Sequence, residues 1–220
     1  WKYRTSYVAD MRMLPEELSE YIESLQYLRE KYRDQIDIKI GLECEYFPEY
    51  IPWLKEQIKK YQLNYILFGN HHFHTDEKFP YFGHHTNNRD MLGLYEESAI
   101  EGMESGLYNC LAHPDLFMRS YPKFDHHCAT ISRHICRTAA RLNIPLEYNI
   151  GYVAYNEEHG LNTYPCPNFW HIAANEGCTA IIGMDVHNNN DLEVPIYYER
   201  ALQELKELKI KTTDTLKMMH

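Results

Sequence analysis

The sequence lacks any long hydrophobic run, and it is poor in positive charge. No apolar segment of its 220 residues is long enough to cross a bilayer, so we expect no membrane partner. Only 22 Lys and Arg stand against 32 Asp and Glu, which gives a net charge of −10. Affinity for a phosphate backbone comes mainly from Lys and Arg, so this balance counts against nucleic acid as a partner.

Two familiar cysteine and glycine motifs are also missing. The six cysteines are dispersed without a C-x-x-C pair, and several lie inside apolar periodic segments. We interpret them as small buried hydrophobic residues in a reducing compartment, and we expect a cytoplasmic protein. No glycine-rich phosphate loop follows any predicted strand, so a dinucleotide-binding fold has no support.

What the sequence does contain is a strict alternation of predicted strands and helices. Strand patterns occur at residues 36–44, 65–69, 108–112, 145–148, 180–183 and 210–213. Apolar residues at helical spacing fill the intervals at residues 15–33, 48–61, 89–105, 127–142, 165–176 and 195–208. Two polar, aromatic segments, 75–88 and 152–164, are predicted to be loops, the first of them over a site.

This alternation predicts an α/β fold in which helices cover a parallel sheet. With 220 residues and 44% hydrophobic composition the chain can bury one substantial core, so we expect a single domain over residues 1–220. A barrel is favoured over an open sheet, because nearly every strand ends in polar residues. Parallel barrels hold their sites at those carboxyl ends.

Polar side chains follow five of the predicted strands. An apolar run that ends at Gly183 leads into Asp185-Val186-His187, which places a carboxylate and an imidazole on the same side of the chain. The other four ends carry Glu43 and Glu45, His71 and His72, His113 and Asp115, and Asn149. Converging carboxylates and imidazoles suit borderline divalent metals such as Zn, Mn or Fe. Such ions activate water at neutral pH, so we expect a hydrolytic metal site.

Five stretches of sequence surround these strand ends. They are Gly41-Leu42-Glu43-Cys44-Glu45-Tyr46-Phe47, Gly69-Asn70-His71-His72-Phe73, Ala112-His113-Pro114-Asp115-Leu116, Leu146-Glu147-Tyr148-Asn149 and Gly183-Met184-Asp185-Val186-His187. In this order they resemble the polymerase-and-histidinol-phosphatase (PHP) superfamily, and most of all its histidinol-phosphate phosphatase branch. The resemblance covers nearly the whole chain. It implies a distorted (β/α)7, TIM-like barrel with up to three divalent metals that hydrolyses phosphomonoesters.

The resemblance also implies a set of metal ligands. These are Glu43 as the bridging carboxylate, His71 and His113 on the second metal, Asp185 on the first and His187 on the third. Glu45 and His72 remain alternatives to Glu43 and His71. Strand alternation does not separate the two glutamates, because both lie on the same face.

Substrate and mechanism follow from the same resemblance. It favours a small phosphorylated substrate, L-histidinol phosphate, hydrolysed to histidinol and phosphate by a metal-bound hydroxide in histidine biosynthesis. Asp185 would be a catalytic residue that assists proton transfer. Arg119 would bind the substrate phosphate, since a guanidinium matches phosphate oxygens in a bidentate way; a solvated loop arginine is the alternative. A protein-tyrosine or nucleotide phosphoesterase of the same superfamily, and a catalytically inactive barrel acting as an interaction module, also remain open.

One part of the family pattern does not occur in the sequence. The family opens with a strand bearing His-x-His and a second strand that ends in a further His, and neither is present here. The predicted barrel would therefore lack its first two strands, and the first and third metals would lack ligands. We accordingly expect about forty further residues ahead of Trp1. The oligomeric state is left open.

Overall fold

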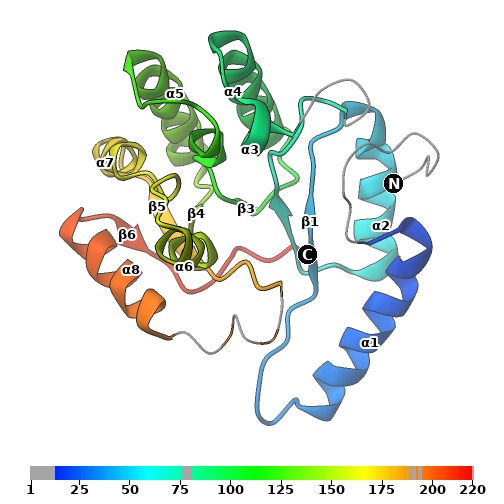
Figure 1. Ribbon diagram of the computed structural model, residues 1–220. Helices are drawn as coiled ribbons and strands as arrows, with labels where there is room; N and C mark the ends of the chain where they lie inside the picture. Colours follow the sequence, from blue (N-terminus) through cyan, green and yellow to red (C-terminus); the bar gives the residue numbers. More distant parts are fainter. Residues whose placement is uncertain (1–12, 76–80, 188, 190–191, 193–194, 220) are drawn as a thin grey trace.

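The computed structural model describes residues 13–75, 81–187, 189, 192 and 195–219. Six parallel strands form one sheet, in which their order is their order along the chain. They are β1 (Gly41–Cys44), β2 (Tyr65–Phe68), β3 (Cys110–Leu111), β4 (Leu146–Asn149), β5 (Thr179–Gly183) and β6 (Lys211–Thr212). Figure 1 shows the strands as an open arc with the helices around its outer side. The predicted α/β fold with a parallel sheet is confirmed, and within the described residues the sheet is not closed.

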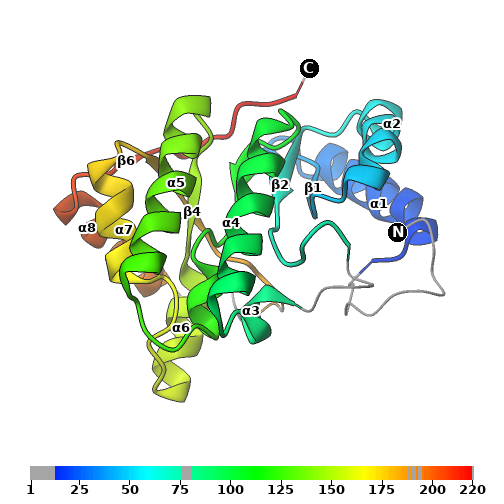
Figure 2. The same ribbon diagram turned by 90° about the horizontal axis from the view of Figure 1, so that it is seen from above.

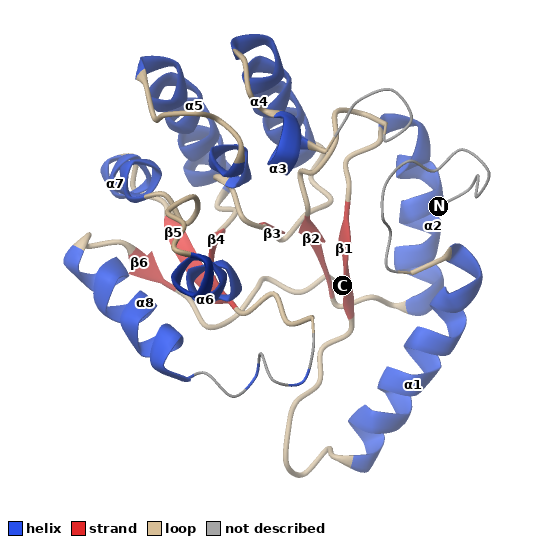
Figure 3. Cartoon of the chain, in the orientation of Figure 1, coloured by secondary structure: helices blue, strands red, loops and turns tan. Residues whose placement is uncertain are grey.

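One helix, α1 (Leu18–Lys31), precedes β1, and the other helices connect the successive strands. These are α2 (Ile51–Tyr61), α3 (Phe82–His85), α4 (Arg89–Glu104), α5 (His126–Leu142), α6 (Ile150–His159), α7 (Pro167–Asn175) and α8 (Pro195–Glu207). Short 3-10 helices lie at Pro15–Glu17, Pro48–Tyr50 and Leu116–Arg119. Figure 3 shows how this helical layer surrounds the short strands. No helix within the described residues is long and apolar enough to cross a membrane.

The neighbouring helices α4 and α5 begin at polar caps and pack side by side against the sheet (Figures 1 and 2). The Asn88 side chain accepts a hydrogen bond from the backbone N–H of Met91. Asp125 accepts from the backbone N–H groups of His127 and Cys128. Each cap satisfies donors that have no partner within the first turn, which fixes where the helix starts.

The hydrophobic core lies between the sheet and the helices. All four residues of β4 are buried, as expected for a parallel strand covered on both faces. Ile66 and Phe68 of β2 are fully buried, and Phe169 and Trp170 of α7 pack into the same core. Each such side chain stabilises the fold by about 1.5–3 kcal/mol. The six cysteines are buried as free thiols, as the sequence predicts.

The predicted loop at residues 152–164 is wrong over most of its length, because it contains α6. The Asn149 side-chain oxygen accepts a hydrogen bond from the backbone N–H of Tyr152. This contact caps a helix that begins directly at the end of β4, and the helix ends at Gly160 with a positive φ of 64°. The cap depends on the geometry of one asparagine, which periodicity does not reveal.

Two other segments differ from their predictions. The strand expected at residues 36–44 is reduced to β1. Of the alternating isoleucines before it, Ile40 is buried and Ile38 packs against the core, but Ile36 is 59% exposed. The loop expected at residues 75–88 contains the short helix α3, and its residues 76–80 lie outside the described residues. In Figure 2, α3 and α6 lie at the same end of the molecule, beyond the carboxyl ends of β2 and β4.

Candidate metal centre

A cavity of about 1530 Å³ opens at the carboxyl ends of the strands and extends to the inner side of α1. The five predicted metal ligands and the predicted phosphate-binding arginine line it: Glu43, His71, His113, Asp185, His187 and Arg119. The structure therefore brings these six side chains to one cavity, and their roles as ligands and phosphate-binding group stay predictions. Their separate roles depend on the distances between them.

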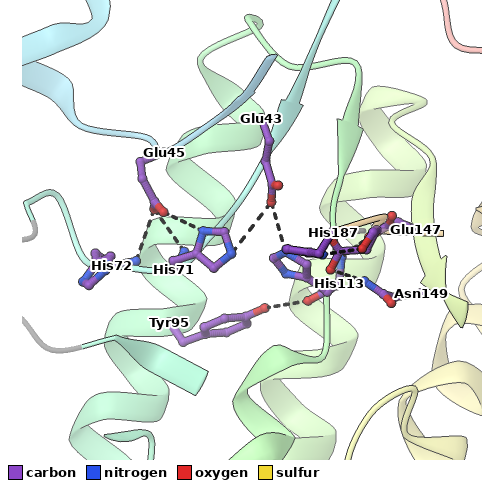
Figure 4. Close-up of polar contacts among 10 residues, drawn as sticks. Glu43, Glu45, His71, His72, Tyr95, His113, Glu147, Asn149 and His187 are labelled. Atoms are coloured by element: carbon purple, nitrogen blue, oxygen red, sulfur yellow. Dashed lines mark hydrogen bonds and ion pairs between the residues drawn. The ribbon is translucent and has the colours of Figure 1, made fainter. Parts of the chain in front are cut away.

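Three of these residues bring donor atoms together. The Glu43 Oε1 atom lies 3.1 Å from His113 Nε2 and 3.8 Å from His71 Nε2. The donor atoms of the three residues all lie within 4.8 Å of one another, and we call this group the donor triad. Figure 4 shows the Glu43 carboxylate pointing between the two imidazole rings. One carboxylate oxygen and two imidazole nitrogens form a donor set that suits a borderline divalent ion.

Glu45, which directly follows β1, contacts His71 instead of joining the donor triad. Its Oε1 atom lies 2.6 Å from His71 Nδ1, and its Oε2 atom accepts from the backbone N–H groups of His71 and His72 at 3.0 and 3.2 Å. With Nδ1 engaged in this way, the Nε2 atom of His71 faces Glu43. A carboxylate that orients an imidazole through its other nitrogen is a recurring support of metal ligands. The geometry therefore places Glu43, and not Glu45, in the donor triad.

His113 is held by its backbone. Its N–H donates to Glu147 Oε2 at 2.9 Å, and the Tyr95 hydroxyl donates to the Pro114 carbonyl at 2.9 Å. The φ angle of His113 is +29°, a region that L-residues seldom adopt, so surrounding contacts must maintain it. Asp115, which the sequence groups with His113, instead accepts from the backbone N–H of Cys166 at 2.5 Å. It thereby fixes the segment before α7.

Asp185 and His187 lie at the border of the donor triad. Asn149 donates to Asp185 Oδ2 at 3.0 Å, and His187 Nδ1 lies 3.5 Å from Asp185 Oδ1. Asp185 has a φ of +46°, so it is, after His113, a second residue of this site in an unusual backbone conformation. Both residues line the cavity, but their donor atoms do not fall within the donor triad.

The charges of the site depend on one another. Burial acts to raise the pKa of Glu43, but the hydrogen bond from His113 and the nearby imidazoles outweigh it and hold the pKa at about 2. Burial acts to lower the pKa of His113, and the contact with Glu43 reverses this and raises it to about 9. Burial raises the pKa of Glu147 to about 7, against the effect of His113. Without a metal, the Glu43 carboxylate is therefore neutralised by the proton of His113, which a metal would displace.

Three further observations concern His113 and the room around the carboxylates of the site. The Nδ1 atom of His113 is buried and has no hydrogen-bond partner within the described part of the chain. A Cβ atom at Gly69 would lie 2.5 Å from Glu43 Oε1, and one at Gly183 would lie 1.8 Å from Glu147 Oε1. Glycine at these two strand exits therefore leaves room for the carboxylates.

Sequence reasoning missed Glu147 as a member of the site. The available signal was a carboxylate in the interior of a short, otherwise apolar strand, which becomes a buried charge unless it is paired. Arg119, which was singled out, ends the 3-10 helix after His113 and lines the cavity. Its guanidinium lies 6.0 Å from the Tyr81 ring centre and 5.3 Å from that of Tyr152.

Fold and site together define a class: an open, parallel α/β sheet with carboxylate and imidazole donors at its carboxyl edge. No family model matches the chain. The chain is 26% identical over 214 residues to a Deinococcus radiodurans protein named "Probable histidinol-phosphatase", covering 94% of this chain and 78% of that protein. It is 36% identical over 74 residues to a Schizosaccharomyces pombe protein of the same name, covering 31% of this chain and 24% of that protein.

A solved structure has a similar fold. It is histidinol phosphate phosphatase from Lactococcus lactis subsp. lactis, complexed with zinc, L-histidinol and phosphate. The TM-score is 0.70, with 16% identity, over 97% of this chain and 82% of that one. These comparisons confirm the resemblance to the histidinol-phosphatase branch of the PHP superfamily that the strand-end motifs indicate.

Proposed function

We propose that the protein is a metal-dependent phosphatase that hydrolyses L-histidinol phosphate to histidinol and phosphate, a step of histidine biosynthesis. The observation that carries this proposal is the donor triad of Glu43, His71 and His113 in a cavity that Arg119 also lines. The names of the two relatives support it, as do the zinc, L-histidinol and phosphate in the Lactococcus lactis structure.

The donor triad would hold one divalent ion, and Asp185 and His187 would contribute to others, up to three in all. Zinc, manganese and iron all suit carboxylate and imidazole donors. When bound, such ions lower the pKa of a water ligand and supply the positive charge that a phosphate ester requires. That charge matters here, because the chain as a whole has a net charge of −10.

The chain's own residues have three further tasks in this proposal. Arg119 binds the phosphoryl oxygens through the N–H groups of its guanidinium. Asp185 assists proton transfer, and the hydrogen bond from Asn149 fixes the orientation of its carboxylate. Glu45 keeps the His71 ring oriented toward Glu43.

The finer description of the fold belongs to the same proposal. We propose one domain over residues 1–220. One hydrophobic core of described residues supports it, because this core extends from Leu18 of α1 to Ile210, just before β6. We also propose a distorted (β/α)7 barrel, in which the β1 and β6 edges of the sheet do not face solvent. An experimental structure that leaves both of these sheet edges open to solvent would contradict the barrel. The six buried free thiols support a reducing compartment such as the cytoplasm.

The function is tested by measuring phosphate release from L-histidinol phosphate after loading the purified protein with Zn²⁺ or Mn²⁺. Asp185→Ala and His113→Asn should each lower kcat/KM by at least about a hundredfold. His134→Asn is a matched control, because His134 is half-exposed on α5 and pairs with Glu96 outside the cavity. Faster hydrolysis of phosphotyrosine or of a short oligonucleotide would favour the alternative substrates instead. A folded protein with no bound metal and no activity would favour an inactive interaction module.

A further inference from the structure

Six side chains from separate segments form a closed ring of contacts around the cavity, which we call the contact ring. Its members are, in order, His71, Tyr81, Arg119, Tyr152, Tyr164 and His113. All six line the cavity, and two of them belong to the donor triad. The contact ring therefore connects the candidate metal ligands directly to the candidate phosphate-binding arginine.

One side of the contact ring consists of stacked aromatic groups. The His71 and Tyr81 rings stack with their centres 5.5 Å apart, and the His71 and His113 rings lie 4.7 Å apart. On the other side, Tyr164 meets His113 edge-on at 6.4 Å and stacks on Tyr152 at 3.9 Å. The spacings of 4.7 to 6.4 Å fall in the usual range of attractive aromatic contacts, and the Tyr152–Tyr164 stack is closer. Tyr81 and Tyr152 are thus each held by a neighbouring aromatic ring, Tyr81 by His71 and Tyr152 by Tyr164.

Arg119 closes the contact ring with its guanidinium near both tyrosine rings, at 6.0 Å from Tyr81 and 5.3 Å from Tyr152. No carboxylate within the described residues forms an ion pair with it. By contrast, Arg137 and Arg141 on α5 each pair with a glutamate. The positive charge of Arg119 is therefore held by π faces instead of by an acid, so it stays available to an anion.

The two tyrosines remain neutral while they hold this charge. Burial raises the pKa of Tyr81 to about 12, and the charge of Arg119 acts in the opposite direction. Burial also raises the pKa of Tyr152. At neutral pH neither phenol is ionised, so neither competes with a phosphate for the guanidinium. What the rings supply is orientation, because a free arginine side chain has about 2 kcal/mol of rotamer entropy to lose on binding.

We propose that Tyr81 and Tyr152 are positioning residues that hold the Arg119 guanidinium over the cavity, preorganised for the phosphoryl group of the substrate. This inference rests on the proposed function only in that the ligand carries a phosphate. It assigns the ring of Tyr152, and not its hydroxyl group, to this positioning, whereas a hydrogen bond with Arg119 also acts on the Tyr81 phenol. Tyr152→Phe should therefore preserve the orientation of the Arg119 guanidinium, and Tyr152→Leu should remove it.

The test measures the affinity of the purified, metal-loaded protein for inorganic phosphate by calorimetry. Tyr152→Leu should weaken phosphate binding about fivefold, while Tyr152→Phe should stay within about twofold of the unsubstituted protein. In an Arg119→Gln background the Leu substitution should have no further effect, because the guanidinium it positions is gone. Tyr155→Leu is the matched control: Tyr155 lies on the same helix with its ring centre 5.0 Å from that of Tyr152, but it does not line the cavity.

Equal losses of phosphate affinity in Tyr152→Phe and Tyr152→Leu would overturn the inference. So would the same fivefold loss from Tyr152→Leu in the Arg119→Gln background, or the absence of phosphate binding to the unsubstituted protein. If Tyr152→Leu does not fold, Tyr152→Met takes its place in the same comparison with Tyr152→Phe. Turnover of histidinol phosphate is assayed separately. If the phosphate affinities change as expected but histidinol phosphate is not hydrolysed, the proposed substrate is contradicted and the role of the tyrosines is still supported.

Discussion

The Glu45 carboxylate holds His71 at two points. One oxygen lies 2.6 Å from the ring Nδ1 atom and the other accepts the backbone N–H at 3.0 Å. A ring that is fixed in this way presents its Nε2 atom to Glu43 without losing further side-chain entropy on metal binding. The side chain of Glu45 is 13% exposed, so this pair is largely shielded from water.

From this contact we predict that Glu45→Ala lowers the affinity for Zn²⁺ by about 10- to 100-fold, with the fold preserved. The affinity is measured by competition with a chromophoric chelator. Glu101→Ala is the control, because Glu101 contacts His74 Nε2 at 2.5 Å in a similar pair that does not line the cavity. Equal zinc affinity in the Glu45 and Glu101 variants would mean that the orienting contact has no role in metal binding.

Two glycines should respond to the same substitution in opposite directions. A Cβ atom at Gly183 would lie 1.8 Å from Glu147 Oε1, so Gly183→Ala should displace this carboxylate and destabilise the fold by about 1–3 kcal/mol. A Cβ atom at Gly93, inside α4, would meet nothing within 4 Å, so Gly93→Ala should stabilise the fold by about 0.5–1 kcal/mol. Urea unfolding, followed by circular dichroism, measures the change in the free energy of unfolding for both variants. A stable Gly183→Ala variant would show that Glu147 can move without cost.

The site could be predicted from the sequence as far as the cavity, because parallel strands bring their carboxyl ends to one edge. That rule placed Glu43, His71 and His113 together. It could not assign Glu45 its task, since two residues on one strand face are equivalent until a neighbouring strand approaches. Nor could it show that Asp115 turns to the backbone of Cys166, a partner 51 positions away along the chain.

The sequence predicted some elements of the fold correctly and missed others. Apolar periodicity located the helices α4 and α5, since each has one buried face. It failed for α6, which starts because the Asn149 side chain caps the Tyr152 N–H group. It also extended β1 too far toward Ile36, because alternation reports a pattern of residue types and not whether a partner strand lies alongside.

Substitution of Asp115 should affect the stability of the fold through a hydrogen bond and not through metal binding. Its buried carboxylate accepts the backbone N–H of Cys166, so Asp115→Ala leaves a buried donor without a partner and should cost about 1–3 kcal/mol. Asp115→Asn keeps an acceptor oxygen of the same shape and should recover most of this loss. Urea unfolding measures both variants. If Ala and Asn were equally stable, the hydrogen bond to Cys166 would not be what Asp115 contributes.

Metal removal should destabilise the protein through the donor triad. A ligand that binds only the folded state stabilises it by about 2.7 kcal/mol at a hundredfold excess over its Kd. For a domain of this size each kcal/mol shifts Tm by about 2–4 °C, so a chelator should lower the Tm of the zinc-loaded protein by about 5–11 °C. His113→Asn removes a donor that lies 3.1 Å from Glu43 and should make Tm much less sensitive to the chelator. His134→Asn, outside the cavity, should leave the full shift. A full shift in both variants would place the stabilising metal elsewhere in the protein, because loss of a triad ligand cannot leave binding at the triad unchanged.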